Sequence, residues 1–101
     1  MTLEQQETFF KEFTDKMANI MLKKGNDYAN EDRLSNFKLA GNICGLKAEQ
    51  NCLSLIATKV ARLGVLLNTN QVNNESIEDS VLDLANYSVL LAMILNEKYK
   101  N

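Results

Sequence analysis

Apolar residues recur at α-helical spacing in three long segments of this sequence, and no proline interrupts any of them. The clearest row lies in the middle of the chain, where successive apolar positions are three or four residues apart. Its members are Leu53, Ile56, Val60, Leu63 and Leu67. This spacing places them on one face of an α-helix, and the absence of proline removes the strongest helix breaker. We therefore expect an all-α fold, and the length of 101 residues favours a single domain over residues 1–101.

Three long helices and one short helix are predicted. Their expected ranges are 2–24, 36–43, 47–67 and 76–98. Segments rich in Asn, Asp and Glu separate them, and these are expected to form a loop over 25–35 and a turn over 68–74. Gly25 is a natural C-terminal stop for the first helix. Ser76, with Asp79 three residues later, resembles a capping box at the start of the last helix.

The last predicted helix is apolar nearly all round after Leu82. A helix without a polar face is buried by neighbouring helices or by another chain. Two other long helices cannot cover all of its sides. We therefore expect a homo-oligomer, a dimer or larger, that completes a helical bundle.

Composition limits the chemistry. The sequence contains no histidine, so histidine-based catalysis and His-ligated zinc are excluded. Any metal would be bound by Asp and Glu oxygens, which suit Mg²⁺ or Mn²⁺. With 11 Lys and Arg against 13 Asp and Glu, the net charge of −2 argues against a nucleic-acid partner. Cys44 and Cys52 have no disulfide or metal-motif spacing and are expected to be small buried residues.

The N-terminal residues are polar and acidic, and the apolar-rich segment 84–95 is interrupted by Asn86, Tyr87 and Ser88. This segment is shorter than the roughly 20 residues that a membrane span needs. A cytoplasmic protein without a membrane partner is therefore expected.

An acidic stripe runs along the last predicted helix, where Glu75, Asp79 and Asp83 follow at four-residue steps. Each step rises about 6 Å along the helix axis, so neighbouring carboxylates can share an ion but all three cannot easily do so. One interpretation is a Mg²⁺ ion held by Asp79 and Asp83, with Glu75 outside it or at a second ion. In the alternative, Glu75 and Asp79 only complement the helix dipole.

Two cations, Lys59 and Arg62, lie three residues apart on the preceding helix. Asp83 sits between Leu82 and Leu84, and a carboxylate in such surroundings needs a cation or several hydrogen-bond donors. Lys59 or Arg62 could supply that cation in a buried ion pair. The two cations could instead hold phosphate groups. Both interpretations remain open from the sequence.

The segment from Lys24 to Lys38 concentrates aromatic, amide and charged residues. Tyr28 or Phe37 could stack on a nucleobase, and Asn36 could form a hydrogen bond with it. In the alternative, the segment is a surface loop and Phe37 packs into the core. On the last helix, Asn86 and Tyr87 extend the side that carries the acidic stripe.

Four motifs, in order, are similar to the nucleotide modification associated domain 1 family. They are Lys24-Gly25-x-Asp27-Tyr28, Asp32-Arg33-x-Ser35-Asn36-Phe37, Lys59-x-x-Arg62-Leu63, and Glu75-Ser76-x-x-Asp79-x-x-x-Asp83-Leu84-Ala85-Asn86-Tyr87. The resemblance covers about residues 24–95. The family is in turn similar to the all-α nucleoside triphosphate pyrophosphatases, the group of MazG and dimeric dUTPases.

This resemblance implies a helical, usually oligomeric nucleotide-binding protein, often encoded by phages. The residues it assigns to the nucleotide are Lys24, Asp27, Tyr28, Asn36, Phe37, Lys59, Arg62, Asn86 and Tyr87. It assigns Mg²⁺ to Glu75, Asp79 and Asp83, with Asp79 and Asp83 as the catalytic pair. The pyrophosphatases also carry a Glu-x-x-Glu pair on a preceding helix, whereas residues 47–67 offer only Glu49.

Three functions follow as hypotheses. The first is Mg²⁺-dependent hydrolysis of a nucleotide between its α and β phosphates. The second is binding without turnover, in which a phage protein sequesters a cyclic or modified nucleotide signal of host defence. The third is a structural interaction module in which Asp83 only pairs with Lys59.

Overall fold

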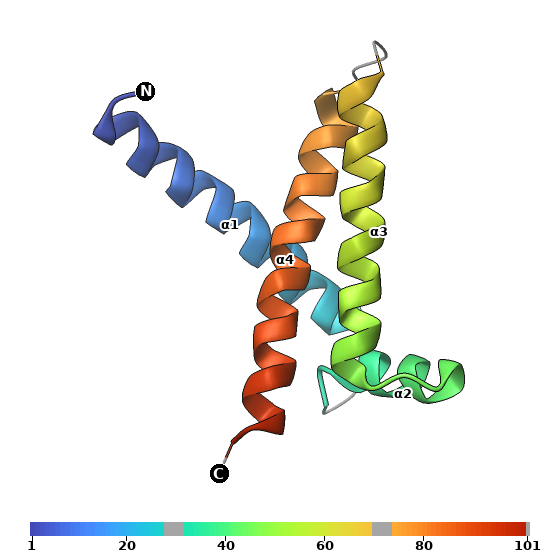
Figure 1. Ribbon diagram of the computed structural model, residues 1–101. Coiled ribbons are helices and arrows are strands. Elements are labelled where there is room, and N and C mark those ends of the chain that lie inside the picture. Colours follow the sequence, from blue (N-terminus) through green and yellow to red (C-terminus); the bar gives the residue numbers. More distant parts are fainter. Residues whose placement is uncertain (28–31, 70–73, 101) are drawn as a thin grey trace.

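Four α-helices make up the computed structural model, which describes residues 1–27, 32–69 and 74–100, and no strand occurs in these ranges (Figure 1). Side chains are not described for residues 24–27 and 74–76. The helices are α1 (Leu3–Asp27), α2 (Ser35–Cys44), α3 (Ala48–Asn68) and α4 (Asn74–Lys98). The predicted all-α class, with three long helices and one shorter helix, is confirmed. None of the described helices is long and apolar enough to span a membrane.

Two predicted helix boundaries were wrong. Helix α1 continues through Gly25 and ends at Asp27. A glycine costs a helix interior about 1 kcal/mol, but it keeps its N–H donor and so does not break the helix. Helix α4 begins at Asn74, so Ser76 lies inside the helix and is not its N-cap.

The connection from α2 to α3 depends on two glycines. Gly45 has a φ of 69°, in the left-handed region that favours glycine. The N–H of Leu46 then turns back and donates to the carbonyl oxygen of Gly41 at 2.7 Å. A Cβ at Gly41 would lie only 2.7 Å from the backbone oxygen of Leu46. The close turn allows α3 to begin almost at once, and Gln50 caps it by accepting a hydrogen bond from the N–H of Lys47 at 2.9 Å.

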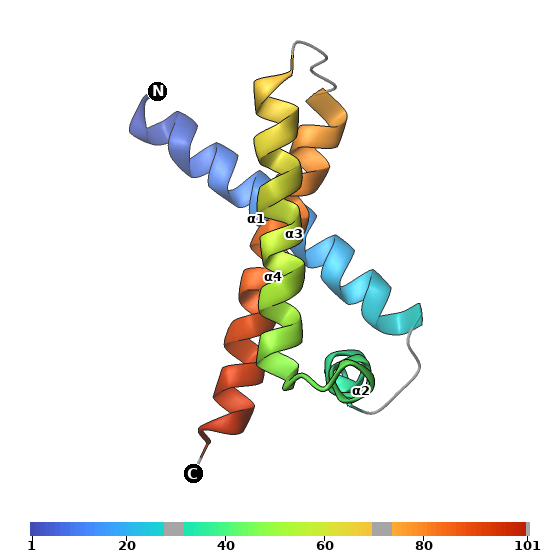
Figure 2. The same ribbon diagram turned by 45° about the vertical axis from the view of Figure 1, so that its right-hand side comes forward.

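Helices α3 and α4 lie side by side and run in opposite directions (Figures 1 and 2). Helix α2 packs across the first turns of α3, and α1 crosses behind α4 with its N-terminal half projecting away from the other helices. A small core forms where α2, α3 and α4 meet, around the buried side chains of Leu34, Cys52 and Ile94. Cys52 is buried as predicted, whereas Cys44 is exposed, because it lies in the last turn of α2 on a side that no other helix covers.

Candidate functional site

The central contact of the candidate site joins α3 to α4. The Lys59 Nζ lies 2.9 Å from the Asp83 Oδ2, and the two side chains are 24% and 29% exposed. Asp83 is therefore neither buried without a partner nor free in solvent. Of the two cations that the sequence offered, Lys59 is the one that forms the ion pair.

Arg62 lies one turn further along α3 and is exposed. Within the described ranges no carboxylate forms an ion pair with it. Its guanidinium thus remains available beside the Lys59–Asp83 pair. Among the described side chains, this part of the surface therefore has one cation more than the ion pairs use.

The described members of the acidic stripe, Asp79 and Asp83, do not form a metal cage with other described side chains. Asp79 is exposed on α4, and one oxygen of Asp83 is bound to Lys59. Across the described part of the chain, no group of three or more Cys, Asp or Glu side chains could hold a metal ion. The side chain of Glu75 lies outside the described residues. The described donor set therefore does not fit the Mg²⁺ ion implied by the resemblance, because Lys59 already neutralises its central carboxylate.

The residues of the Lys24–Lys38 segment that were predicted to bind a nucleotide do not all lie at the surface. Phe37 is partly buried and packs against the Leu34, Cys52 and Ile94 cluster, which is the alternative in which it belongs to the core. Asn36 is exposed on α2. The backbones of Lys24 and Asp27 belong to α1, but their side chains are outside the described set. Tyr28 lies outside the described residues altogether.

Asn86 and Tyr87 take part in packing between helices. Asn86 is 6% exposed, and its Nδ2 donates to the backbone oxygen of Met17 on α1 at 3.2 Å. Its buried Oδ1 has no hydrogen-bond partner in the described structure. Tyr87 is packed against the core, and its backbone oxygen accepts a hydrogen bond from the Cys52 thiol at 3.5 Å.

A charged network outside the predicted site residues ties α2 to the end of α4. The Lys38 Nζ lies 2.6 Å from the Asp32 Oδ2 and 2.6 Å from the Glu97 Oε1. The Asp32 Oδ1 also accepts a hydrogen bond from the N–H of Leu34 at 3.0 Å. The Lys38 hydrogen bond, with that of Leu34, lowers the pKa of Asp32 below its usual value. The local turn could have been foreseen from Asp32 just before a helix, but the distant partner Glu97 had no sequence signal.

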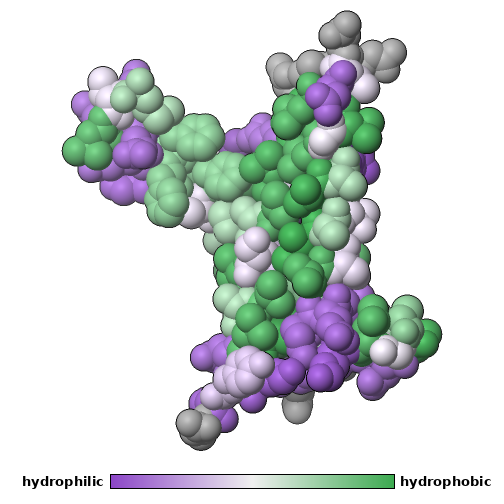
Figure 3. Space-filling view, in the orientation of Figure 1, coloured by the Kyte–Doolittle hydropathy of each residue, from purple (hydrophilic) through white to green (hydrophobic). Residues whose placement is uncertain are grey.

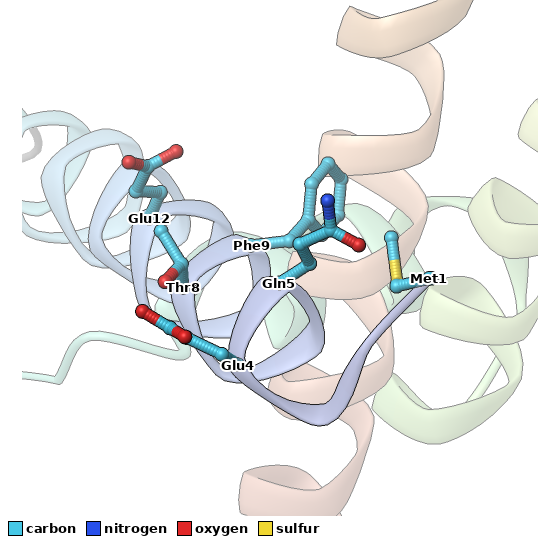
Figure 4. A pocket seen from close by; sticks show the side chains of 6 residues that line it. All are labelled: Met1, Glu4, Gln5, Thr8, Phe9 and Glu12. Atoms are coloured by element: carbon cyan, nitrogen blue, oxygen red, sulfur yellow. The ribbon is translucent and has the colours of Figure 1, made fainter.

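Two hollows of the described surface lie on the N-terminal half of α1, away from the predicted site. Six residues line the larger one: Met1, Glu4, Gln5, Thr8, Phe9 and Glu12 (Figure 4). The other is lined by Gln6, Glu7, Phe10 and Lys11. All of these residues come from one terminal segment, so both hollows are open surface depressions rather than clefts between elements.

Comparisons of this chain with models of known protein families, with curated proteins and with solved structures gave no match.

Proposed function

We propose that this chain is a nucleotide-binding helical protein in which Lys59 and Arg62 hold the phosphate groups. The observation that carries the proposal is the exposed Arg62, which forms no ion pair with a described carboxylate and lies one turn from a partly exposed Lys59–Asp83 pair. The four ordered motifs of the sequence add support from an independent direction, because they resemble a family associated with nucleotides.

The chemistry of the two cations suits phosphate. A lysine ammonium has three donors, so Lys59 can bind a phosphate oxygen while it keeps its contact with Asp83. The planar guanidinium of Arg62 can donate two parallel hydrogen bonds to one phosphate group. Asn36, exposed on α2, and the aromatic residue Tyr28 are the proposed contacts to the base.

Binding without hydrolysis is the better-supported form of this function. Asp83 is neutralised by Lys59, and Asp79 is the only other member of the acidic stripe with a described side chain. Hydrolysis between the α and β phosphates by a Mg²⁺-activated water would need carboxylates free to coordinate the ion. A stored or sequestered nucleotide needs only the cations.

One observation favours a second candidate, a purely structural interaction module. The Lys59–Asp83 pair joins two helices, so it could serve only to fix the α3–α4 register. In that case a nucleotide would not bind, and the exposed Arg62 would have no ligand.

Calorimetric titration with nucleoside triphosphates, deoxynucleoside triphosphates and cyclic nucleotides, in the presence of EDTA, tests the proposal. Arg62→Ala should weaken the binding of a nucleotide at least about tenfold, the effect of one lost charge-assisted contact. Lys11→Ala on α1 removes the same charge from an exposed position far from the site and should leave the affinity unchanged. Absence of binding for every nucleotide, or equal affinities for Arg62→Ala and the wild type, would refute the proposal.

Product analysis with Mg²⁺ or Mn²⁺ separates the two forms of the function. We expect nucleotides to be recovered intact. Release of pyrophosphate by the wild type, lost in Asp83→Asn, would instead establish hydrolysis at this site.

A further inference from the structure

The N-terminal half of α1 forms an arm whose side chains are uncovered. This α1 arm comprises residues 3–12, and every one of them is exposed. Among the described residues, α1 packs only against α4, and the polar contacts of Lys16 and Met17 with α4 lie beyond the end of the arm. The arm therefore projects away from the other helices (Figures 1 and 2).

An apolar row runs outward along the α1 arm from the crossing with α4. Its members are Met17, Phe13, Phe10 and Leu3, which share one face because they follow at steps of four, three and seven residues. Met17 and Phe13 are partly buried, whereas Phe10 is 67% and Leu3 is 70% exposed. Phe9 flanks the row, and its ring stacks on that of Phe13 with the centroids 5.9 Å apart. A contiguous exposed apolar row of this kind marks a contact with another molecule.

Carboxylates lie beside the exposed rings. Phe9 lines the larger hollow together with Glu4 and Glu12 (Figure 4). Figure 3 shows the same mixture on the visible side of the arm, where hydrophobic side chains adjoin hydrophilic ones. An aromatic ring next to a carboxylate suits a Lys or Arg side chain, because the aliphatic part packs on the ring while the charged end pairs with the carboxylate.

The α1 arm is acidic. It carries three carboxylates, Glu4, Glu7 and Glu12, against the single cation Lys11. The whole chain has 13 Asp and Glu against 11 Lys and Arg, so the arm accounts for the net charge of −2 and the remainder is neutral. None of the three carboxylates forms an ion pair with a described side chain.

This charge decides which partner fits the apolar row. Two arms from identical chains would bring like charges together, and a surface of anionic lipids would repel the carboxylates. A cationic partner removes the repulsion, and the helical spacing of the row matches the apolar side of another helix.

We infer that the α1 arm binds a basic amphipathic helix of a different protein. The apolar residues of that helix lie along the row from Leu3 to Met17, and its Lys or Arg side chains reach the three carboxylates. The arm is separate from Lys59 and Arg62, so the inference does not depend on nucleotide binding.

Fluorescence anisotropy with two labelled peptides of about 18 residues, or five helical turns, tests this inference. One peptide has leucines at helical spacing and lysines elsewhere, and the other has glutamates in place of the lysines. The leucine–lysine peptide should bind the wild-type chain, and the leucine–glutamate peptide should not. Phe10→Ala should weaken the binding at least about tenfold, because the peptide no longer buries the ring. Tyr99→Ala removes an aromatic side chain of similar exposure, 69%, near the C-terminus and should leave the affinity unchanged.

A charge variant tests the second part of the surface. The triple variant Glu4→Gln, Glu7→Gln, Glu12→Gln should weaken the binding of the leucine–lysine peptide at least about fivefold. Asp15→Asn, an exposed position of α1 beyond the arm, should change the affinity less than about twofold. Circular dichroism should show equal helix content in all variants, because every substituted side chain is exposed.

Absence of binding of the leucine–lysine peptide would overturn the inference. So would an unchanged affinity in Phe10→Ala or in the triple variant, or equal binding of the leucine–glutamate peptide. A wild-type dimer that Phe10→Ala converts to a monomer in sedimentation would assign the arm to a second copy. Phosphatidylglycerol vesicles that bind the wild type but not Phe10→Ala would assign it to a lipid surface. Either of these last two results also overturns the inference.

Discussion

The side-chain amide of Asn86 on α4 donates a hydrogen bond to the backbone oxygen of Met17 on α1, at 3.2 Å. Close by, the Lys16 Nζ lies 2.7 Å from the Glu78 Oε1, so two polar contacts hold the crossing of these helices. The Asn86 contact is the buried one, because Asn86 is 6% exposed whereas both partners of the ion pair are at least half exposed. Asn86 therefore fixes the position at which α1 crosses α4.

Asn86→Ala should lower the free energy of unfolding by about 1–2 kcal/mol, because it removes a buried hydrogen bond and leaves a small cavity. Limited proteolysis should cut this variant within α1 faster than it cuts the wild type. Asn96→Ala, the same change at an exposed position of the same helix, is the control and should change neither quantity. Equal cleavage rates for Asn86→Ala and wild type would contradict the assigned role.

The Lys59–Asp83 pair is suited to a double-mutant cycle. The variants Lys59→Met, Asp83→Asn and the double variant should give a coupling free energy of about 1 kcal/mol, the upper end for ion pairs near the surface. The double variant should lose less free energy of unfolding than the sum of the losses in the two single variants. The reason is that each single variant leaves one charged or polar group without its partner. Chemical denaturation at constant protein concentration measures the effect. A coupling of zero would mean that the pair does not contribute to the α3–α4 register.

Gly41→Ala and Gly64→Ala should have opposite effects on stability. A Cβ at Gly41 would lie 2.7 Å from the backbone oxygen of Leu46, so the tight α2–α3 turn would have to open. At Gly64, within α3, nothing lies within 4 Å of the added Cβ. Gly64→Ala should therefore stabilise the helix by up to about 1 kcal/mol, whereas Gly41→Ala should destabilise the protein. Thermal unfolding of both variants checks this, and a stabilised Gly41→Ala would contradict the described turn.

The pKa of Asp32 is lowered by its hydrogen bonds, and that of Lys38 is raised by its contacts with Asp32 and Glu97. A carboxyl with a lowered pKa stabilises the folded state above its unfolded pKa of 3.8, and this contribution is lost as the pH falls through the folded pKa. The contribution of Lys38 to the stability of the folded state is fully present below pH 10.5, its unfolded pKa. It is lost as the pH rises through the raised folded pKa. The stability gained from this pair is therefore greatest between these two limits.

Asp32→Asn should accordingly lower the unfolding temperature near pH 6, and its difference from wild type should shrink as the pH falls below about 3.8. Asp15→Asn serves as the control, because Asp15 is exposed on α1 and forms no ion pair with any described residue. Its difference from wild type should not vary with pH in this way. A constant difference for Asp32→Asn from pH 6 to pH 2.5 would show that Lys38 does not hold the carboxylate.

Much of the helical architecture was readable from the sequence because helix periodicity is local. The row from Leu53 to Leu67 predicted α3 to within one residue at each end. The predictions were wrong where one residue type is compatible with two local structures or environments. Gly25 can end a helix or be tolerated inside one, and nothing nearby in the sequence decides which. Cys44 was expected to be buried because of its residue type, but its exposure depends on where α2 sits.

The candidate site was only partly predictable. The sequence showed that Asp83 needs a cation, since it follows Leu82 and precedes Leu84, and it limited the choice to Lys59 or Arg62. Which of them pairs with Asp83 depends on the relative rotation and register of α3 and α4. Asn86 was predicted as a nucleotide contact, and its buried hydrogen bond to Met17 could not have been foreseen, because the two residues are 69 positions apart.

By itself, the sequence determined the helical class, the approximate helix ranges and the absence of histidine chemistry. These properties depend on interactions between residues three or four apart, or simply on which side chains exist. Only the tertiary structure decided that Lys59 neutralises Asp83, that Arg62 remains unpaired among the described residues, and that α1 covers the side of α4 that carries Asn86. These outcomes depend on the angles at which the helices cross, which are set by packing across the whole chain.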